Sequence, residues 1–81
     1  MCAIRYHLLR RLYLKKAFVH GHLLGEHLLR CVPSHLRGRA KETLKELVKE
    51  GLIAIYGPTK YGIAYQLNID KLDEIERILQ E

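Results

Sequence analysis

Apolar residues recur every three or four positions along most of this chain, a period typical of helices that bury one face. The first apolar stripe runs through residues 4–13, and the basic side chains of this segment fall mostly off it. A second, shorter stripe covers residues 23–31 and stops before Pro33, because proline cannot continue a helix. Between the two stripes, residues 17–20 break the period and predict a brief extended segment or a single β-bridge.

The longest amphipathic stretch follows Ser34, a residue type that caps helix N-termini. Its apolar face consists of Leu36, Ala40, Leu44, Leu47 and Val48. Gly38 costs about 1 kcal/mol inside a helix, so the helix is expected to begin either at the Ser34 cap or nearer Arg39. Gly51 is a residue type on which helices commonly end. The sequence therefore predicts a third helix with one apolar face and one strongly charged face.

The segment after Gly51 alternates with the period of β-strands. Residues 52–56 predict a strand that is apolar on both faces, and residues 63–68 predict the return strand. The pairs Gly57-Pro58 and Tyr61-Gly62 between them mark a hairpin loop. A last helix is expected over residues 70–81, with Asp70 as its cap. The first turn of that helix also carries Asp73 and Glu74, and its apolar stripe is Leu72, Ile75, Ile78 and Leu79.

The length of 81 residues indicates one small domain, which buries only about 60% of the surface of its unfolded chain. No apolar run approaches the roughly 20 residues that a membrane-spanning helix requires. The two cysteines are too few for a disulfide scaffold, so a reducing, cytoplasmic setting is expected. Residues 1–49 carry eleven Lys/Arg and three Asp/Glu, a net charge of +8, whereas residues 50–81 carry a net charge of −3. This division fits a polyanion-binding face and a separate, non-binding end, although small basic proteins are common.

The predicted order is helix, short strand, helix, helix, hairpin and helix. In this order, and in the run Leu44-Lys-Glu-Leu-Val-Lys-Glu-Gly-Leu-Ile53 before the hairpin, residues 4–68 resemble the winged helix-turn-helix family. The resemblance implies a small α+β domain whose wing covers residues 52–68. The chain departs from the family pattern in two places. Residues 31–39 are longer than the usual tight turn, and Arg37-Gly38-Arg39 stands where a Ser/Thr pair is common.

The resemblance also implies a DNA-binding regulator of transcription, which reads the major groove with the third helix and contacts the backbone or the minor groove with the wing. Arg37 and Arg39 lie where base contacts begin, and the planar arginine side chain matches two guanine acceptors at once. Lysines at four-residue steps form a row that is assigned to phosphates. The residues expected to contact nucleic acid are Ser34, His35, Arg37, Arg39, Lys41, Glu42, Lys45, Lys49, Thr59, Lys60 and Tyr61.

Simpler interpretations exist for each of these features. The third helix could present an ordinary solvated face on which Glu42 and Glu46 pair with the lysines, and the hairpin could merely expose Lys60. Arg37-Gly38-Arg39 also resembles a minor-groove hook, but its flanking residues look like core positions. Fold does not fix function, so a protein-protein interaction module that uses the apolar strand and the last helix is a second hypothesis. RNA binding is a third.

Metal and catalytic chemistry find little support in the sequence. His20, His22, His27 and Cys31 suggest a metal site only weakly, because no pair among them has zinc-ligand spacing. Cys2 is interpreted as an ordinary terminal residue. No nucleophile-base pair and no phosphate-cradling glycine loop is evident. The chain is therefore not expected to be an enzyme, to hold a metal or cofactor, or to contain a small-molecule site.

The apolar stripe of the last helix requires burial. Leu72, Ile75, Ile78 and Leu79 could pack on the first helix of their own chain or on a second subunit. Because a core this small benefits from additional burial, the interpretation favours a homodimer through the first and last helices. Such a dimer would present two recognition helices to a roughly palindromic duplex.

Overall fold

The computed structural model describes residues 3–18, 21–30 and 32–80. Its helices are α1 (Ala3–Leu14), α2 (Gly25–Leu29), α3 (Arg37–Glu50) and α4 (Leu72–Gln80). Its strands are β1 (Leu23–Leu24), β2 (Ile53–Thr59) and β3 (Gly62–Leu67). Short 3-10 helices, η1 (Ser34–Leu36) and η2 (Ile69–Lys71), precede α3 and α4. The α+β class and the order of elements predicted from the sequence are confirmed.

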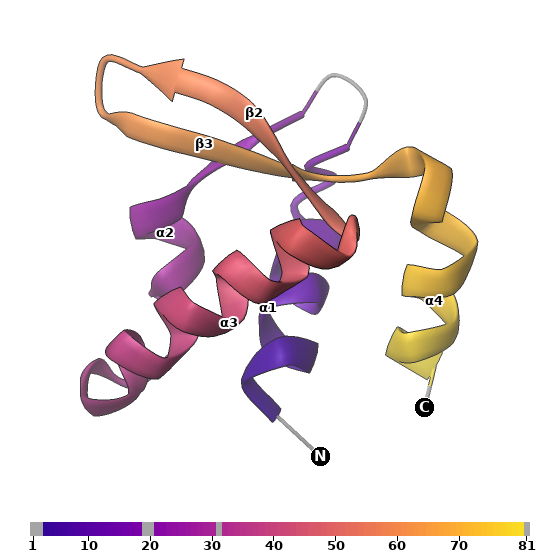
Figure 1. Cartoon of the computed structure of the whole chain (residues 1–81), viewed down its shortest axis with the longest axis horizontal. Helices are drawn as coiled ribbons and strands as arrows, with labels where there is room; N and C mark the ends of the chain where they lie inside the picture. The colour runs from indigo at the N-terminus through magenta and orange to yellow at the C-terminus, as the bar shows by residue number, and fades with distance from the viewer. Residues whose placement is uncertain (1–2, 19–20, 31, 81) are drawn as a thin grey trace.

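The three strands form one antiparallel sheet in the order β1-β3-β2. The hairpin β2-β3 pairs from Ile53 opposite Leu67 to Thr59 opposite Gly62. The strand β1 contributes only two residues, which pair with Tyr65 and Ala64 of β3. The outer part of the hairpin therefore has no third strand beside it. Figure 1 shows this part extending past α2 to the upper left of the molecule.

The core lies between the inner end of the sheet and the helices. Helix α1 runs through the middle of the molecule and contacts α2, α3, α4 and β3 (Figure 1). Completely buried leucines on α1 meet the apolar stripe of α3 and the first residues of the hairpin. The largest fully buried side chains are Leu8, Leu9, Leu12, Leu28, Leu47, Leu52, Ile53, Leu67 and Ile75. Because one face of α3 is buried in this core, its opposite face is fixed outward.

The first strand does not lie where the sequence suggested. The prediction of an extended segment at residues 17–20 is wrong for Ala17 and Phe18, which follow α1 as an irregular bend, and Val19 and His20 lie outside the described residues. The Ala17 carbonyl does accept a hydrogen bond from the Leu67 amide at 2.7 Å. Strand pairing instead involves β1, because β3 is available beside it. Helix α2 is consequently shorter than the predicted 23–31.

Two predicted caps are also wrong. Ser34 begins η1 instead of capping a helix, and the residue before α3 is Leu36, which makes no side-chain cap bond. The 3-10 helix continues directly into α3, so Gly38 lies inside the first helical turn. Before the last helix, the cap is Asn68 and not Asp70, since the Asn68 Oδ1 accepts a hydrogen bond from the Asp70 amide at 3.1 Å. Asp73 and Glu74 do lie in the first turn of α4, as predicted.

The hairpin loop is shorter than the predicted Gly57–Gly62 segment. Gly57 and Pro58 belong to β2, because a bulge at Tyr56 shifts the register and lets the strand continue to Thr59. Gly57 has φ +146°, a conformation that L side chains rarely adopt. Only Lys60 and Tyr61 remain as the turn. The bulge thus lengthens the paired hairpin and carries its tip further from the core.

The junction between α3 and β2 is held by several hydrogen bonds. Gly51 adopts φ +85°. The Gly51 amide donates a hydrogen bond to the Val48 carbonyl, and the Leu52 amide donates to the Leu47 carbonyl. This pair of hydrogen bonds ends many helices. The Asn68 side-chain amide donates to the Gly51 carbonyl at 2.7 Å, and its backbone amide donates to Leu52 at 3.0 Å. Asn68 therefore ties the end of β3 to the end of α3.

Helix α4 folds back on α1 of its own chain. Ile75 is completely buried, and Ile78 and Leu79 are partly buried against the same core. The Tyr13 hydroxyl donates a hydrogen bond of 2.7 Å to the Glu76 carboxylate across the two helices. The burial of Ile75 thus requires no second subunit, and the homodimer stays a prediction.

Replacement of Asn68 by alanine removes two side-chain hydrogen bonds, one to the Gly51 carbonyl and one from the Asp70 amide, which is the cap. We expect Asn68→Ala to lower the free energy of unfolding by about 1–2 kcal/mol. The matched control is Asp70→Ala, which removes the side chain that the sequence favoured as the cap and should cost less than about 0.5 kcal/mol. Urea denaturation of both variants measures this difference. A larger loss in the Asp70 variant would show that the cap is assigned to the wrong residue.

Truncation of Ile75 tests whether α4 docks within the chain. Ile75→Ala should lower the free energy of unfolding by about 2–5 kcal/mol, because it opens a cavity in the core. Ile69→Ala, at a side chain that is 51% exposed, should cost far less. Urea midpoints of the wild-type chain measured at several protein concentrations complete the test. A midpoint that rises with concentration would mean that a second subunit contributes to the burial.

Candidate nucleic-acid interface

The charged face of α3 is exposed over its whole length. Every residue of η1 and α3 that the sequence assigned to nucleic acid is exposed, namely Ser34, His35, Arg37, Arg39, Lys41, Glu42, Lys45 and Lys49. Ala40, Thr43, Leu44 and Leu47 form the buried side of the same helix. The Thr43 hydroxyl satisfies itself by donating to the Arg39 carbonyl at 3.0 Å. No side chain of the charged face is thus required by the core.

Helical geometry divides these cations into two groups. Residues four apart are neighbours on a helix, so Arg37, Lys41, Lys45 and Lys49 form one continuous row, which we call the basic row. Arg39 is two residues from Arg37, and this spacing turns about 200° around the helix axis. The sequence treated Arg37 and Arg39 together, whereas the structure puts them on opposite flanks of the exposed face.

The basic row is not neutralised by neighbouring carboxylates. Within residues 3–18, 21–30 and 32–80, no carboxylate lies within ion-pair distance of Arg37, Lys41, Lys45 or Lys49. The pairing of the lysines with Glu42 and Glu46, proposed above as the simpler interpretation, is therefore not formed. The acid that does form an ion pair on α3 is Glu50, whose Oε2 lies 2.7 Å from the Arg5 guanidinium on α1. This ion pair joins the last residue of α3 to α1 and involves no member of the basic row.

A groove connects the basic row to the hairpin. It has a volume of about 130 Å³, and its walls come from α3 on one side and from β2 and β3 on the other. Its lining residues are Leu44, Lys45, Val48, Ile55 and Tyr65. Because Lys45 belongs to both the row and the groove, the charged face of α3 and the hairpin adjoin one another.

The hairpin tip presents the third part of the predicted interface. The Thr59 hydroxyl donates to the Gly62 carbonyl at 2.6 Å and accepts from the Tyr61 amide at 3.1 Å, which closes the turn. Thr59 is therefore half-buried and occupied within the turn, whereas Lys60 is exposed and Tyr61 is 74% exposed. Both residues belong to the turn that closes the hairpin, and the tip of the hairpin lies at the upper left of Figure 1. They are free to meet a partner that lies against α3.

The hairpin also exposes an unusual amount of apolar surface. Ile55, Tyr56 and Ile63 are each about half exposed. The Tyr56 ring stacks on the His22 imidazole, with ring centroids 4.2 Å apart and planes 13° from parallel. Such exposed apolar groups often mark contact surfaces.

A second hollow, which sequence reasoning did not anticipate, lies between α2 and the start of α3. It has a volume of about 550 Å³ and is lined by Glu26, Leu29, Arg30, Arg37 and Lys41. Arg30 was not among the predicted site residues. No local pattern could have identified it, because its proximity to Arg37 depends on how the two helices pack.

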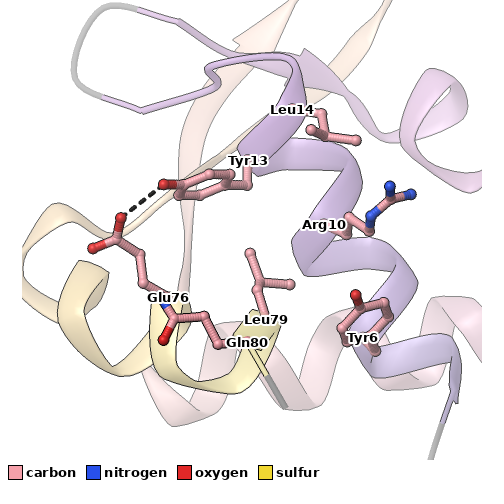
Figure 2. A pocket seen from close by; sticks show the side chains of 7 residues that line it. All are labelled: Tyr6, Arg10, Tyr13, Leu14, Glu76, Leu79 and Gln80. Carbon is pink, nitrogen blue, oxygen red and sulfur yellow. Dashed lines mark hydrogen bonds between the residues drawn. The ribbon is translucent and has the colours of Figure 1, made fainter.

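A third hollow lies between α1 and α4, on the side shown in Figure 2. Its volume is about 220 Å³, and its lining includes Tyr6, Arg10, Leu14 and Leu79. The Tyr13–Glu76 hydrogen bond crosses it (Figure 2). This bond, together with the negative charge of Glu76, raises the pKa of Tyr13 above its usual value. The hollow is open and shallow, and Leu14 at its rim is 61% exposed.

Comparisons with known proteins do not identify a related site. A scan against protein-family models and searches of curated proteins and of solved structures returned no match to this chain. In the described part of the chain, no three His, Cys, Asp or Glu side chains are grouped so that they could hold a metal ion. His20 and Cys31, two of the four residues that suggested a metal site, lie outside that part, and so does Cys2. None of the described helices has the length and apolar character needed to cross a membrane.

The Arg5–Glu50 pair gives a pH-dependent contribution to the docking of α3 on α1. The hydrogen bond from Arg5 holds the pKa of Glu50 below its usual value. Stability from a lowered carboxylate pKa is present above the unfolded pKa, about 4.3, and is lost as the pH falls through the folded pKa. At pH 7, Glu50→Gln should therefore lower the free energy of unfolding by about 0.2–1 kcal/mol, as is usual for a largely exposed pair.

Urea denaturation between pH 7 and pH 3 measures this effect. The difference between wild type and Glu50→Gln should shrink as the pH falls, because Glu50 becomes protonated in the wild type. Glu42→Gln is the matched control on the same helix and should show no such convergence. A Glu50 difference that is independent of pH would contradict the assigned pair.

Proposed function

We propose that this protein is a DNA-binding regulator of transcription with a winged helix-turn-helix architecture. In this proposal α3 lies in the major groove and the hairpin serves as the wing on the adjacent backbone or minor groove. The observation that carries the proposal is the basic row, whose four cations lack carboxylate partners in the described structure and adjoin the hairpin at Lys45. The helix order and the β1-β3-β2 sheet agree with this architecture.

The dimensions of α3 suit the major groove. Its 14 residues give a rod about 21 Å long, and the groove of B-DNA is wide enough to admit one helix. Gly38 lies between the flanks occupied by Arg37 and Arg39, and a Cβ at this position would have nothing within 4 Å. The open space above Gly38 allows the nucleic acid to approach the helix closely, while the two arginines reach towards opposite walls of the groove.

The lysines supply sequence-independent affinity in this proposal. Lys41, Lys45 and Lys49 contact phosphates, and Lys60 and Tyr61 contact the backbone or minor groove from the wing. Lysine suits this role because it is a flexible point charge with three donors. Ser34 and His35 are exposed ahead of α3 and remain candidates for backbone contacts. Base discrimination then falls to the arginines and to Glu42, which can accept a hydrogen bond from cytosine.

A protein-protein interaction module is the second candidate function. The exposed Ile55, Tyr56 and Ile63 favour it, because a DNA backbone makes little use of such groups. A homodimer through α1 and α4 is compatible with either function, and the hollow lined by the exposed Leu14 and by Leu79 offers a surface for it. Ile55→Ser with Ile63→Ser separates the two functions, since it should abolish binding of a protein partner while it leaves duplex binding within about twofold.

Duplex binding at different salt concentrations tests the proposed function. The wild-type chain should bind random-sequence duplex at low salt, with an affinity that falls steeply as salt rises. Simultaneous Lys41→Gln, Lys45→Gln and Lys49→Gln should reduce the slope of log K against log salt by about 2.7, or about 0.9 for each lost phosphate contact. Fluorescence anisotropy of a labelled duplex provides the measurement.

Two exposed cations near the other end of the chain provide the control. Lys71→Gln combined with Arg77→Gln lowers the net charge on η2 and α4 and should leave the slope unchanged. Equal losses in the two sets of variants would mean that only the total charge matters. No detectable duplex binding by the wild type at low salt would remove the proposal.

A further inference from the structure

We infer that Arg30, Arg37 and Lys41 form a phosphate-binding site between α2 and α3, which holds a backbone phosphate of the bound duplex outside the α3 groove contact. The inference rests on the proposed function for the source of the phosphate. It adds Arg30, the residue that follows α2, to the interface and gives Arg37 a role different from base recognition.

The geometry of the hollow supports a shared site for one anion. Arg30 comes from the end of α2, and Arg37 and Lys41 come from the first two turns of α3, yet all three line one hollow of about 550 Å³. The hollow is open to solvent, so a group attached to a long polymer can enter it. The buried Leu29 forms part of its wall and supports the position of α2.

The excess of positive charge in the hollow favours an anionic ligand. Three cations line it against one carboxylate, Glu26, within the described part of the chain. The nearest oxygen of Glu26 lies 3.7 Å from the Arg30 guanidinium, which is beyond hydrogen-bond distance, and both side chains are more than half exposed. An exposed pair at this distance contributes little. The guanidinium donors of Arg30 therefore remain available to an anion that enters between the cations.

The chemistry of the side chains points to phosphate. A guanidinium donates two parallel hydrogen bonds to phosphate oxygens, and an ammonium adds a compact point charge. An arginine that follows α2 and an arginine and a lysine of α3 can surround a tetrahedral anion from more than one side. A neutral ligand would leave this charge uncompensated.

The position of Arg37 determines how its replacement should affect duplex binding. Arg37 begins the basic row and also lines the hollow, so a phosphate held there continues the line of Lys41, Lys45 and Lys49 towards α2. Replacement of Arg37 should then weaken binding to all sequences alike. Arg39 lies on the other flank of α3 and does not line the hollow, so its replacement should change the preference among sequences.

The anion site itself is tested with sodium pyrophosphate as the probe. In a titration followed by NMR, the side-chain Nε–Hε signals of Arg30 and Arg37 should shift at lower concentrations than that of Arg77, an exposed arginine on α4. Arg30→Gln should reduce the apparent affinity at Arg37 at least threefold. Shifts of equal size at Arg30, Arg37 and Arg77 would overturn the inference, because they would indicate general attraction of anions to a basic protein.

Duplex binding tests the source of the phosphate. Arg30→Gln should lower the slope of log K against log salt by about 0.9, the value for one phosphate contact, whereas Arg77→Gln should leave it unchanged. An unchanged slope in the Arg30 variant overturns the inference while the proposed function stands. If the wild type binds pyrophosphate in the hollow but no duplex, the proposed function and the duplex as phosphate source both fail. Backbone amide spectra of each variant, expected to match wild type away from the substitution, verify the fold.

Discussion

The arrangement of the molecule depends on the hydrogen-bonded junction at which α3 becomes β2. The left-handed Gly51 ends the helix, and within two residues the chain is buried again at Leu52 and Ile53. Asn68 bonds to both sides of this turn and simultaneously caps η2. The helix and the hairpin are consequently joined without a flexible loop. Any ligand that meets the basic row therefore meets a hairpin whose direction is already fixed, and ordering it on binding costs little entropy.

The elements that could be predicted are those in which the spacing of apolar residues shows which face is buried. The apolar stripes of α1, α3 and α4 identified those helices, and the alternation after Gly51 identified the hairpin. The failures occurred where a distant partner decided the local structure. Residues 23–24 look helical in sequence, but they become a strand because β3 lies beside them. Gly57 and Pro58 look like a loop, but the bulge at Tyr56 keeps them paired. Asn68 and Asp70 are both good caps, and only the fold selects between them.

The candidate site shows the same division. Charge and periodicity indicated correctly that the predicted residues of α3 would be exposed. Which of these residues lie close together depends on the geometry of the helix and on the elements packed against it. Arg37 and Arg39 are close in sequence and yet lie on opposite flanks, while Arg30 is seven residues from Arg37 and yet lines the same hollow. Packing of α2 against α3 creates this proximity, and it cannot be predicted from the sequence pattern of either helix alone.

The acidic last helix lies away from the start of α3. Helix α4 carries Asp73, Glu74 and Glu76 and packs on α1, on the side of the molecule away from the hairpin tip and the start of α3 (Figure 1). Glu76 is engaged by Tyr13, so this charge is held in place by the core itself. The carboxylates of α4 thus lie apart from the basic row on a body that is 29 Å in its longest dimension. A polyanion is attracted by the cations of α3 and repelled by the carboxylates of α4, and this field favours collisions in which α3 faces the ligand. The hollow lined by Arg30, Arg37 and Lys41 lies at the start of α3, so the proposed phosphate site would extend the proposed interface of α3 and would not compete with it.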